Sequence, residues 1–131
     1  MSAEDDRILV TGGAGFIGCN FVRLALARGA TRVVGVEPRA ERYHDALLLK
    51  EIKGSTVEFQ QRDILVDPPS ESFDLVLLLN VTHHLANPIQ ALHQLAAITR
   101  EQLVIEFPTL DDRKFRPHTD TRLLPHERII P

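Results

Sequence analysis

The segment from Ile8 to Leu26 constrains the fold of this chain more than any other part of it. An apolar run, Ile8 to Val10, leads into glycines at positions 12, 13, 15 and 18, and apolar residues at helical spacing continue to Leu26. This order predicts a strand, a glycine-rich turn and a helix. The turn lets the backbone approach a ligand closely, and the free N–H groups of the helix's first turn favour a phosphate or carboxylate. The segment therefore predicts a nucleotide-binding loop.

The rest of the chain continues to alternate between strand and helix patterns. Strands are expected at 7–10, 32–36, 57–59, 73–79 and 102–107, and helices at 15–28, 40–53 and about 87–99. This alternation predicts the α/β fold class, as a Rossmann-like three-layer αβα domain with a mostly parallel sheet of about five strands. We expect the cofactor-binding domain to span residues 1–108 and an irregular tail to span residues 109–131.

Composition narrows the range of partners. The 131 residues carry a formal net charge of −3, which favours neither a nucleic acid nor a membrane surface as a partner. No apolar run approaches the roughly 20 residues of a membrane-spanning helix, and the acidic start, Met1 to Asp6, is not typical of a signal peptide. The single cysteine, Cys19, suits a reducing compartment. We expect a cytoplasmic protein that acts on a small molecule.

Residues 7–36 resemble the extended short-chain dehydrogenases, the family of NAD-dependent sugar epimerases and dehydratases. The string from Ile8 to Gly18, followed by Arg28 and Gly29, matches the opening of that family in residues and spacing. The resemblance implies that the loop holds a pyrophosphate and that Glu37 binds the adenosine ribose of NAD.

The catalytic pair of that family, Tyr-x-x-x-Lys, is missing. Tyr43 is the only tyrosine, and Leu47 stands four residues later. This excludes an intact hydride-transferring epimerase, unless the catalytic half lies on another polypeptide.

Residues from about 31 to 115 resemble the class I S-adenosylmethionine-dependent methyltransferases. The likeness rests on Arg32 to Pro38, on the strand Gln102 to Phe107, and above all on Phe73 to Pro88, in which an apolar strand is followed by His-His-Leu and Asn-Pro. In both families an acid that ends the second strand accepts the ribose hydroxyls, which implies this role for Glu37. An Asp after the third strand can accept from the adenine amino group, which implies a role for Asp63.

The candidate site residues follow from these two resemblances. Asn80 could position the methionine portion or the substrate, and His83 or His84 could act as a general base, because a neutral imidazole can take a proton from a hydroxyl. The spacing of His83, His84 and His93 does not suit a metal site. The predicted cofactor-binding residues are Thr11, Gly12, Gly13, Gly15, Phe16, Ile17, Gly18, Glu37, Asp63, Ile64 and Asn80.

Three functions remain open at this point. The first is a methyltransferase-like protein that uses S-adenosylmethionine, although its first loop has Leu9 where that family places an acid. The second is an NAD-binding domain related to the epimerases, and the third is a non-catalytic binding module of the same fold. In each case a homo-oligomer or a partner chain could cover the exposed sheet edge.

Overall fold

The computed structural model describes residues 6–12, 16–79 and 81–107 of the chain. Within these ranges five strands alternate with three α-helices and one 3-10 turn, η1. In chain order the elements are β1 (Arg7–Thr11), α1 (Phe16–Ala27), β2 (Arg32–Val36), α2 (Ala40–Lys53), β3 (Glu58–Gln60), β4 (Phe73–Leu79), η1 (Thr82–His84), α3 (Pro88–Ala97) and β5 (Thr99–Glu106). The predicted tail, 109–131, lies outside the described residues.

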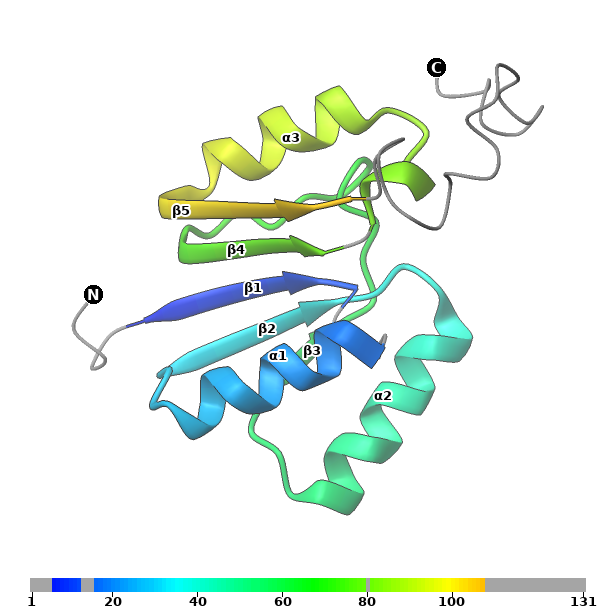
Figure 1. Cartoon of the computed structure of the whole chain (residues 1–131). Helices are drawn as coiled ribbons and strands as arrows, with labels where there is room; N and C mark the ends of the chain where they lie inside the picture. Colours follow the sequence, from blue (N-terminus) through cyan, green and yellow to red (C-terminus); the bar gives the residue numbers. More distant parts are fainter. Residues whose placement is uncertain (1–5, 13–15, 80, 108–131) are drawn as a thin grey trace, which may run out of the picture.

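The five strands form one parallel sheet in the order β3-β2-β1-β4-β5 (Figure 1). The predicted α/β class and five-stranded parallel sheet are therefore confirmed. The chain fills one half of the sheet from β1 outward to β3 and then crosses to β4 on the other side of β1. The point between β1 and β4 is thus a topological switch point, the place where open α/β sheets bind ligands.

Two apolar cores lie on opposite faces of the sheet. On one face, Ala91 and Leu95 of α3 pack with Val76 and Leu78 of β4. On the other face, Val22 of α1 packs against a second cluster drawn from β1, β2 and β4. Figure 1 shows α3 on one side of the sheet and α1 and α2 on the other. The three layers predicted from the alternation of elements are present.

Local sequence explains where the helices begin and end. Gly54, with φ of 61°, adopts the left-handed conformation that ends α2, as its position after Lys53 predicts. Asn87 caps α3 by accepting a hydrogen bond from the Gln90 N–H at 3.0 Å, and Pro88 occupies the first helical turn. The Gln90 side chain bonds the Asn87 side chain at 3.3 Å, whereas a full capping box would bond the Asn87 backbone.

The observed strand bounds differ slightly from the predicted ones. β3 runs over Glu58–Gln60 and β5 begins at Thr99, before a register shift in its pairing with β4. The segment 61–72 that joins β3 to β4 contains no helix. Among the helices that the structure describes, none is long and apolar enough to cross a bilayer.

Charged residues at the amino-terminal ends of the strands pair with one another. Arg32, at the start of β2, contacts Glu58 at 3.0 Å and also pairs with Glu71. The hydrogen bonds that the Arg32 guanidinium donates to Glu71 and to Glu58 raise its pKa. At the start of β4, Asp74 accepts the Arg7 N–H at 2.9 Å and contacts Arg100 at 3.4 Å. These contacts lower the pKa of Asp74, the backbone hydrogen bond having the largest effect.

Candidate functional site

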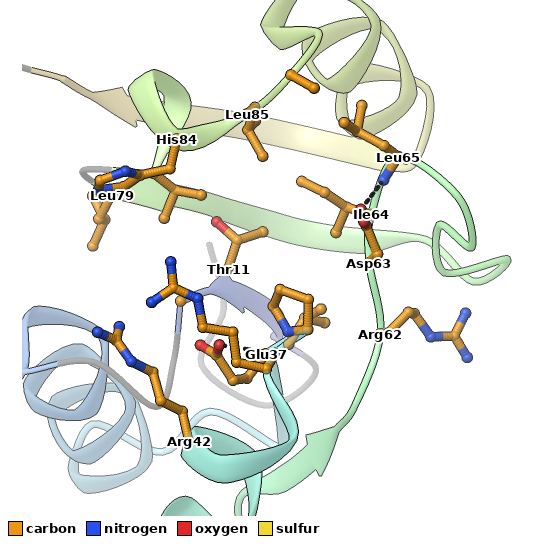
Figure 2. Close-up of a pocket in the computed structure, with 16 residues that line it drawn as sticks. Thr11, Glu37, Arg42, Arg62, Asp63, Ile64, Leu65, Leu79, His84 and Leu85 are labelled. Atoms are coloured by element: carbon orange, nitrogen blue, oxygen red, sulfur yellow. Dashed lines mark hydrogen bonds between the residues drawn. The ribbon is translucent and has the colours of Figure 1, made fainter. Parts of the chain in front are cut away.

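A cavity of about 560 Å³ opens at the carboxyl ends of β1, β2 and β4, at the switch point of the sheet (Figure 2). Its volume lies within the range of about 300 to 1,000 Å³ that is usual for small-molecule sites. The cavity is lined by residues of the strand ends and of the segments that follow them: Thr11, Gly12, Val36, Glu37, Pro38, Arg39, Arg42, Arg62, Asp63, Ile64, Leu65, Leu79, Val81, His84, Leu85 and Ala86.

The end of β1 forms the floor of this cavity. The Thr11 hydroxyl is buried and donates to the Leu77 carbonyl at 3.0 Å, which ties β1 to β4. Gly12 continues the ladder by donating its N–H to the Val36 carbonyl at 3.0 Å. Its φ of 68° favours glycine, and an added Cβ would lie 3.0 Å from Cγ2 of Val81. Gly12 therefore keeps the floor of the cavity open.

Glu37 places a buried carboxylate at the end of β2. The residue is 5% exposed, and its Oε1 accepts the Arg39 N–H at 3.1 Å. Its backbone is held on the β3 side, since its N–H donates to the Gln60 carbonyl and its carbonyl accepts the Arg62 N–H. A carboxylate offers about four acceptor positions, and this is its one hydrogen bond within the described ranges. Glu37 can therefore accept two further donors from a ligand.

The segment after β3 forms the next wall. The exposed Asp63 accepts the Leu65 N–H on Oδ1 at 2.9 Å, the dashed line in Figure 2. This local bond fixes a turn that points Ile64 inward, where it is 5% exposed and joins the core under α3. The structure thus brings Asp63 and Ile64 to the same cavity as Glu37, as the site prediction requires.

The end of β4 contributes the remaining wall. His84, in η1, lines the cavity and is exposed, and Leu79 and Leu85 lie beside it (Figure 2). The side chain of His83 lies outside the described residues, as does Asn80. Of the predicted loop, Gly13 and Gly15 lie outside them too. Phe16, Ile17 and Gly18 begin α1, but their side chains are not described.

Two arginines at the cavity were not predicted as site residues. Arg39 precedes α2 and Arg42 lies in its first turn, and both line the cavity. Neither forms an ion pair within the part of the chain that the structure describes. Arg62 also lines the cavity, but its guanidinium contacts Asp67 at 3.5 Å and turns outward in Figure 2. Arg39 and Arg42 follow Pro38 and are three residues apart. This spacing is the sequence pattern that could have indicated that both arginines line the cavity.

These features define a class of protein. A parallel α/β sheet has a cavity at its switch point, with a buried carboxylate at the end of the second strand and an apolar residue after the third. Such a site suits a nucleoside, whose ribose hydroxyls are a pair of donors and whose base has apolar faces. The fold and the site thus define an α/β domain of the kind that can hold a nucleoside at its switch point.

The family is shown by a comparison with models of protein families. The model described as "Methyltransferase domain" matches residues 12–104, which is most of the chain. The chain therefore belongs to this methyltransferase family. The match includes residues 12–36 of the segment that resembles the epimerases, so the predicted relationship of that segment to the epimerases is not supported.

Solved structures agree with this assignment. The N-terminal domain of EvdMO1, crystallised with SAH bound, is 29% identical, with a TM-score of 0.59 over 72% of this chain and 40% of that one. The YcgJ protein from Bacillus subtilis is 27% identical, with a TM-score of 0.61 over 77% of this chain and 44% of that one. A SAM-dependent methyltransferase from Aquifex aeolicus has the same fold, with a TM-score of 0.69 at 20% identity. The match covers 96% of this chain and 66% of that one.

The chain spans less than half the length of the first two of these proteins. A comparison with curated protein sequences gives no match.

Proposed function

We propose that this chain binds S-adenosylmethionine in the cavity at the switch point and serves in methyl transfer to a small molecule. The observation that carries the proposal is the buried Glu37 carboxylate, which lines that cavity in a chain of the methyltransferase family. The EvdMO1 domain, crystallised with SAH, supports the choice of cofactor. The epimerase resemblance makes NAD the competing ligand, since its adenosine portion would meet the same carboxylate.

The residues of the cavity fit the adenosine portion. Glu37 would accept the ribose hydroxyls, because its carboxylate has one protein hydrogen bond and room for more. Asp63 keeps acceptor positions on Oδ2 for the adenine amino group, since Leu65 bonds Oδ1. The buried Ile64 gives the base an apolar surface, and Gly12 leaves space beside Val81.

The proposed chemistry asks little of the protein beyond alignment. When bound, the cofactor supplies a methyl group already activated by its sulfonium. The protein then has to orient the acceptor and exclude water. His84 lies at the exposed end of the cavity. One of its ring nitrogens would take the proton from the hydroxyl group of the molecule that is methylated. Arg39 and Arg42 favour an acceptor or cofactor group that carries negative charge.

The test compares ligands on one preparation of the protein. Isothermal titration calorimetry and thermal unfolding are recorded with S-adenosylhomocysteine and with NAD. A ligand at 100 times its dissociation constant adds about 2.7 kcal/mol of stability, which a thermal scan detects. The proposal is supported if S-adenosylhomocysteine binds and NAD does not. Binding of NAD alone contradicts it, and binding of neither supports a non-catalytic module.

Methyl transfer itself is tested by a screen of small hydroxy acids and phenols with S-adenosylmethionine labelled in the methyl group. For an acceptor that is found, His84→Ala should lower kcat by about a hundredfold, the lower end of general-base contributions, and leave S-adenosylhomocysteine affinity unchanged. The matched control is His93→Ala, which changes an exposed histidine of α3 outside the cavity. An equal loss in both variants would remove His84 from the mechanism.

A further inference from the structure

Two of the arginines that line the cavity have no anionic partner there. Arg62 contacts Asp67, whereas Arg39 and Arg42 form no ion pair within residues 6–12, 16–79 and 81–107. The carboxylate of Glu37 bonds the backbone N–H of Arg39. A guanidinium group has five N–H donors in a planar array that matches a carboxylate or a phosphate. Two such groups therefore line one cavity and can both donate to a ligand.

The stability of α2 does not explain why these arginines stand where they do. Arg39 is the N-cap residue and its side chain makes no capping hydrogen bond, and Arg42 lies in the first turn. The amino-terminal end of a helix carries a partial positive charge, so cations there are unfavourable. Lys50 and Lys53, in the last turn, have the favourable placement, and the first turn has one acid, Glu41. An anion in the cavity would offset the excess positive charge at this end of α2.

The direction of the Arg42 side chain indicates which part of a ligand it would meet. In Figure 2 it extends from α2 to the side of Glu37 on which His84 lies, and Asp63 lies on the other side. The strand order β3-β2-β1-β4 accounts for this separation, because β4 is two strands, or about 10 Å, from β2. An anion bound by Arg42 would therefore lie toward the carboxyl end of β4.

We propose that Arg39 and Arg42 bind a carboxylate or phosphate group of the methyl acceptor, so that the substrate is an anionic hydroxy compound. The inference rests on the proposed function, in which Asp63 and Glu37 hold the adenine and the ribose. With the base over β3 and the ribose over β2, the sulfonium end of the cofactor points toward β1 and β4. The acceptor then lies on the side of the cavity that Arg42 and His84 share.

The charge of the cofactor favours the acceptor as the source of this anion. The methionine portion carries a carboxylate and an ammonium group on the same carbon, so this end of the cofactor has no net charge. Two guanidinium groups are matched better by a carboxylate or phosphate that has no neighbouring cation. Either group can accept two parallel hydrogen bonds from one guanidinium.

Inorganic phosphate tests whether the two arginines form an anion site. It is titrated at constant ionic strength, because salt screens exposed charges, and the arginine Nε–H signals are followed by NMR. Arg39→Gln and Arg42→Gln should each weaken phosphate binding by about tenfold. The matched control, Arg28→Gln, removes an exposed arginine that does not line the cavity and should leave the affinity unchanged. Equal affinity in all three variants overturns the proposal.

Thermal unfolding distinguishes this role from a structural one. Because both arginines oppose the dipole of α2, Arg39→Gln and Arg42→Gln should unfold at the same temperature as the parent or a higher one when no phosphate is present. A lower unfolding temperature in both variants would assign the arginines to the stability of the fold and overturn the proposal.

S-adenosylhomocysteine separates the acceptor from the cofactor as the source of the anion. Phosphate should still bind to protein saturated with S-adenosylhomocysteine, and Arg42→Gln should leave the affinity for S-adenosylhomocysteine unchanged. If phosphate no longer binds and the variant holds S-adenosylhomocysteine more weakly, the arginines hold the cofactor's own carboxylate and the proposal is overturned. A parent that binds phosphate but not S-adenosylhomocysteine would contradict the proposed function, and with it the assignment to a methyl acceptor, while the anion site would stand.

Three aromatic probes identify the anionic group. Benzoate, phenyl phosphate and benzamide share a ring and differ in charge, and each is titrated into protein saturated with S-adenosylhomocysteine. Benzoate or phenyl phosphate should bind about tenfold more tightly than benzamide, and the tighter of the two identifies the group. Arg39→Gln and Arg42→Gln should remove this preference, and Arg28→Gln should keep it. Equal affinity for the three probes, including binding of none, overturns the proposal.

Discussion

The two ends of the strands in this sheet carry charge in different ways. At the amino-terminal ends, Arg32 pairs with Glu58 and Glu71, and Asp74 bonds the Arg7 N–H and Arg100. At the carboxyl-terminal ends, Arg39 and Arg42 line the cavity and have no carboxylate partner among the described residues, whereas Arg62 contacts Asp67. The Glu37 carboxylate itself is bonded only by a backbone N–H within that part of the chain.

This difference indicates that the charges at one end of the strands stabilise the fold, whereas those at the other end serve to bind a ligand. Charges that satisfy one another hold strands in place, and such partly exposed pairs contribute about 1 kcal/mol or less. Charges that are buried at a cavity without a charged partner cost stability unless a ligand pairs with them. We therefore expect substitutions at the amino-terminal ends to change the free energy of unfolding, and substitutions at the carboxyl-terminal ends to change affinity.

The largest effect is expected for Glu37→Gln. The amide keeps the size of the side chain but removes a charged acceptor, which costs about 2 kcal/mol of binding, or roughly thirtyfold in affinity for S-adenosylhomocysteine. Calorimetry measures the affinity and thermal unfolding the stability. The control is Glu58→Gln, which should lower stability by less than 1 kcal/mol and leave affinity unchanged. If both variants bind S-adenosylhomocysteine equally well, the assignment of binding to the carboxyl-terminal ends of the strands is contradicted.

A smaller effect, about 2 kcal/mol of stability at most, is expected for Gly12→Ala. The new Cβ meets a positive φ and lies 3.0 Å from Val81 Cγ2. Gly54→Ala is the matched control, because its φ of 61° is similar and nothing lies within 4 Å of its added Cβ. The difference between the two variants in urea unfolding measures the crowding alone. Combining Gly12→Ala with Val81→Ala should remove that difference, and an unchanged difference would place the crowding elsewhere.

Arg32→Met should cost about 1 kcal/mol of stability and leave binding unchanged. The substitution keeps an apolar stem and removes the partner of two carboxylates. The pKa of Glu58 is lowered in the protein, first by the Gln60 hydrogen bond and then by Arg32. It should therefore rise in the variant, which titration followed by NMR measures. If the pKa of Glu58 is the same in the variant and the parent, the Gln60 hydrogen bond alone lowers it.

The smallest effect is expected for Asp74→Asn, and it depends on pH. Because the folded protein lowers the pKa of Asp74, the charged side chain stabilises the fold above its unfolded pKa of about 3.9. This contribution is lost as the pH falls through the lower, folded-state pKa. The variant should be less stable than the parent by less than about 1 kcal/mol at pH 7, and the two should converge in acid. A constant difference from pH 7 to pH 2 would contradict this assignment.

Most of the fold could be predicted from the sequence because each element carries a local pattern. The apolar run Leu75–Leu79 predicts a strand buried on both faces, and the range Ala40–Lys53 predicts a helix that the structure shows with the same bounds. The short β3 was displaced by one residue. A three-residue strand has too few positions for a period to fix its ends. The register shift at the start of β5 depends on β4 and has no local pattern.

The candidate site was predictable only where a residue type and a strand end coincide. Glu37 follows a strand and is acidic, which predicts its place at the cavity. Arg39 and Arg42 were not predicted as site residues, because an arginine near the start of a helix is usually a surface residue. That they line the cavity depends on how α2 leaves the sheet, which is a property of the tertiary structure.

The strand at the centre of the sheet also affects how the chain folds as it is synthesised. Thr11 in β1 bonds to Leu77 in β4, 66 residues later in the chain. The second neighbour of β1, which is β4, is synthesised after β1 to β3, so one edge of β1 has no strand partner until β4 is made. The closing step is then the arrival of β4, and its long loop makes that step slow.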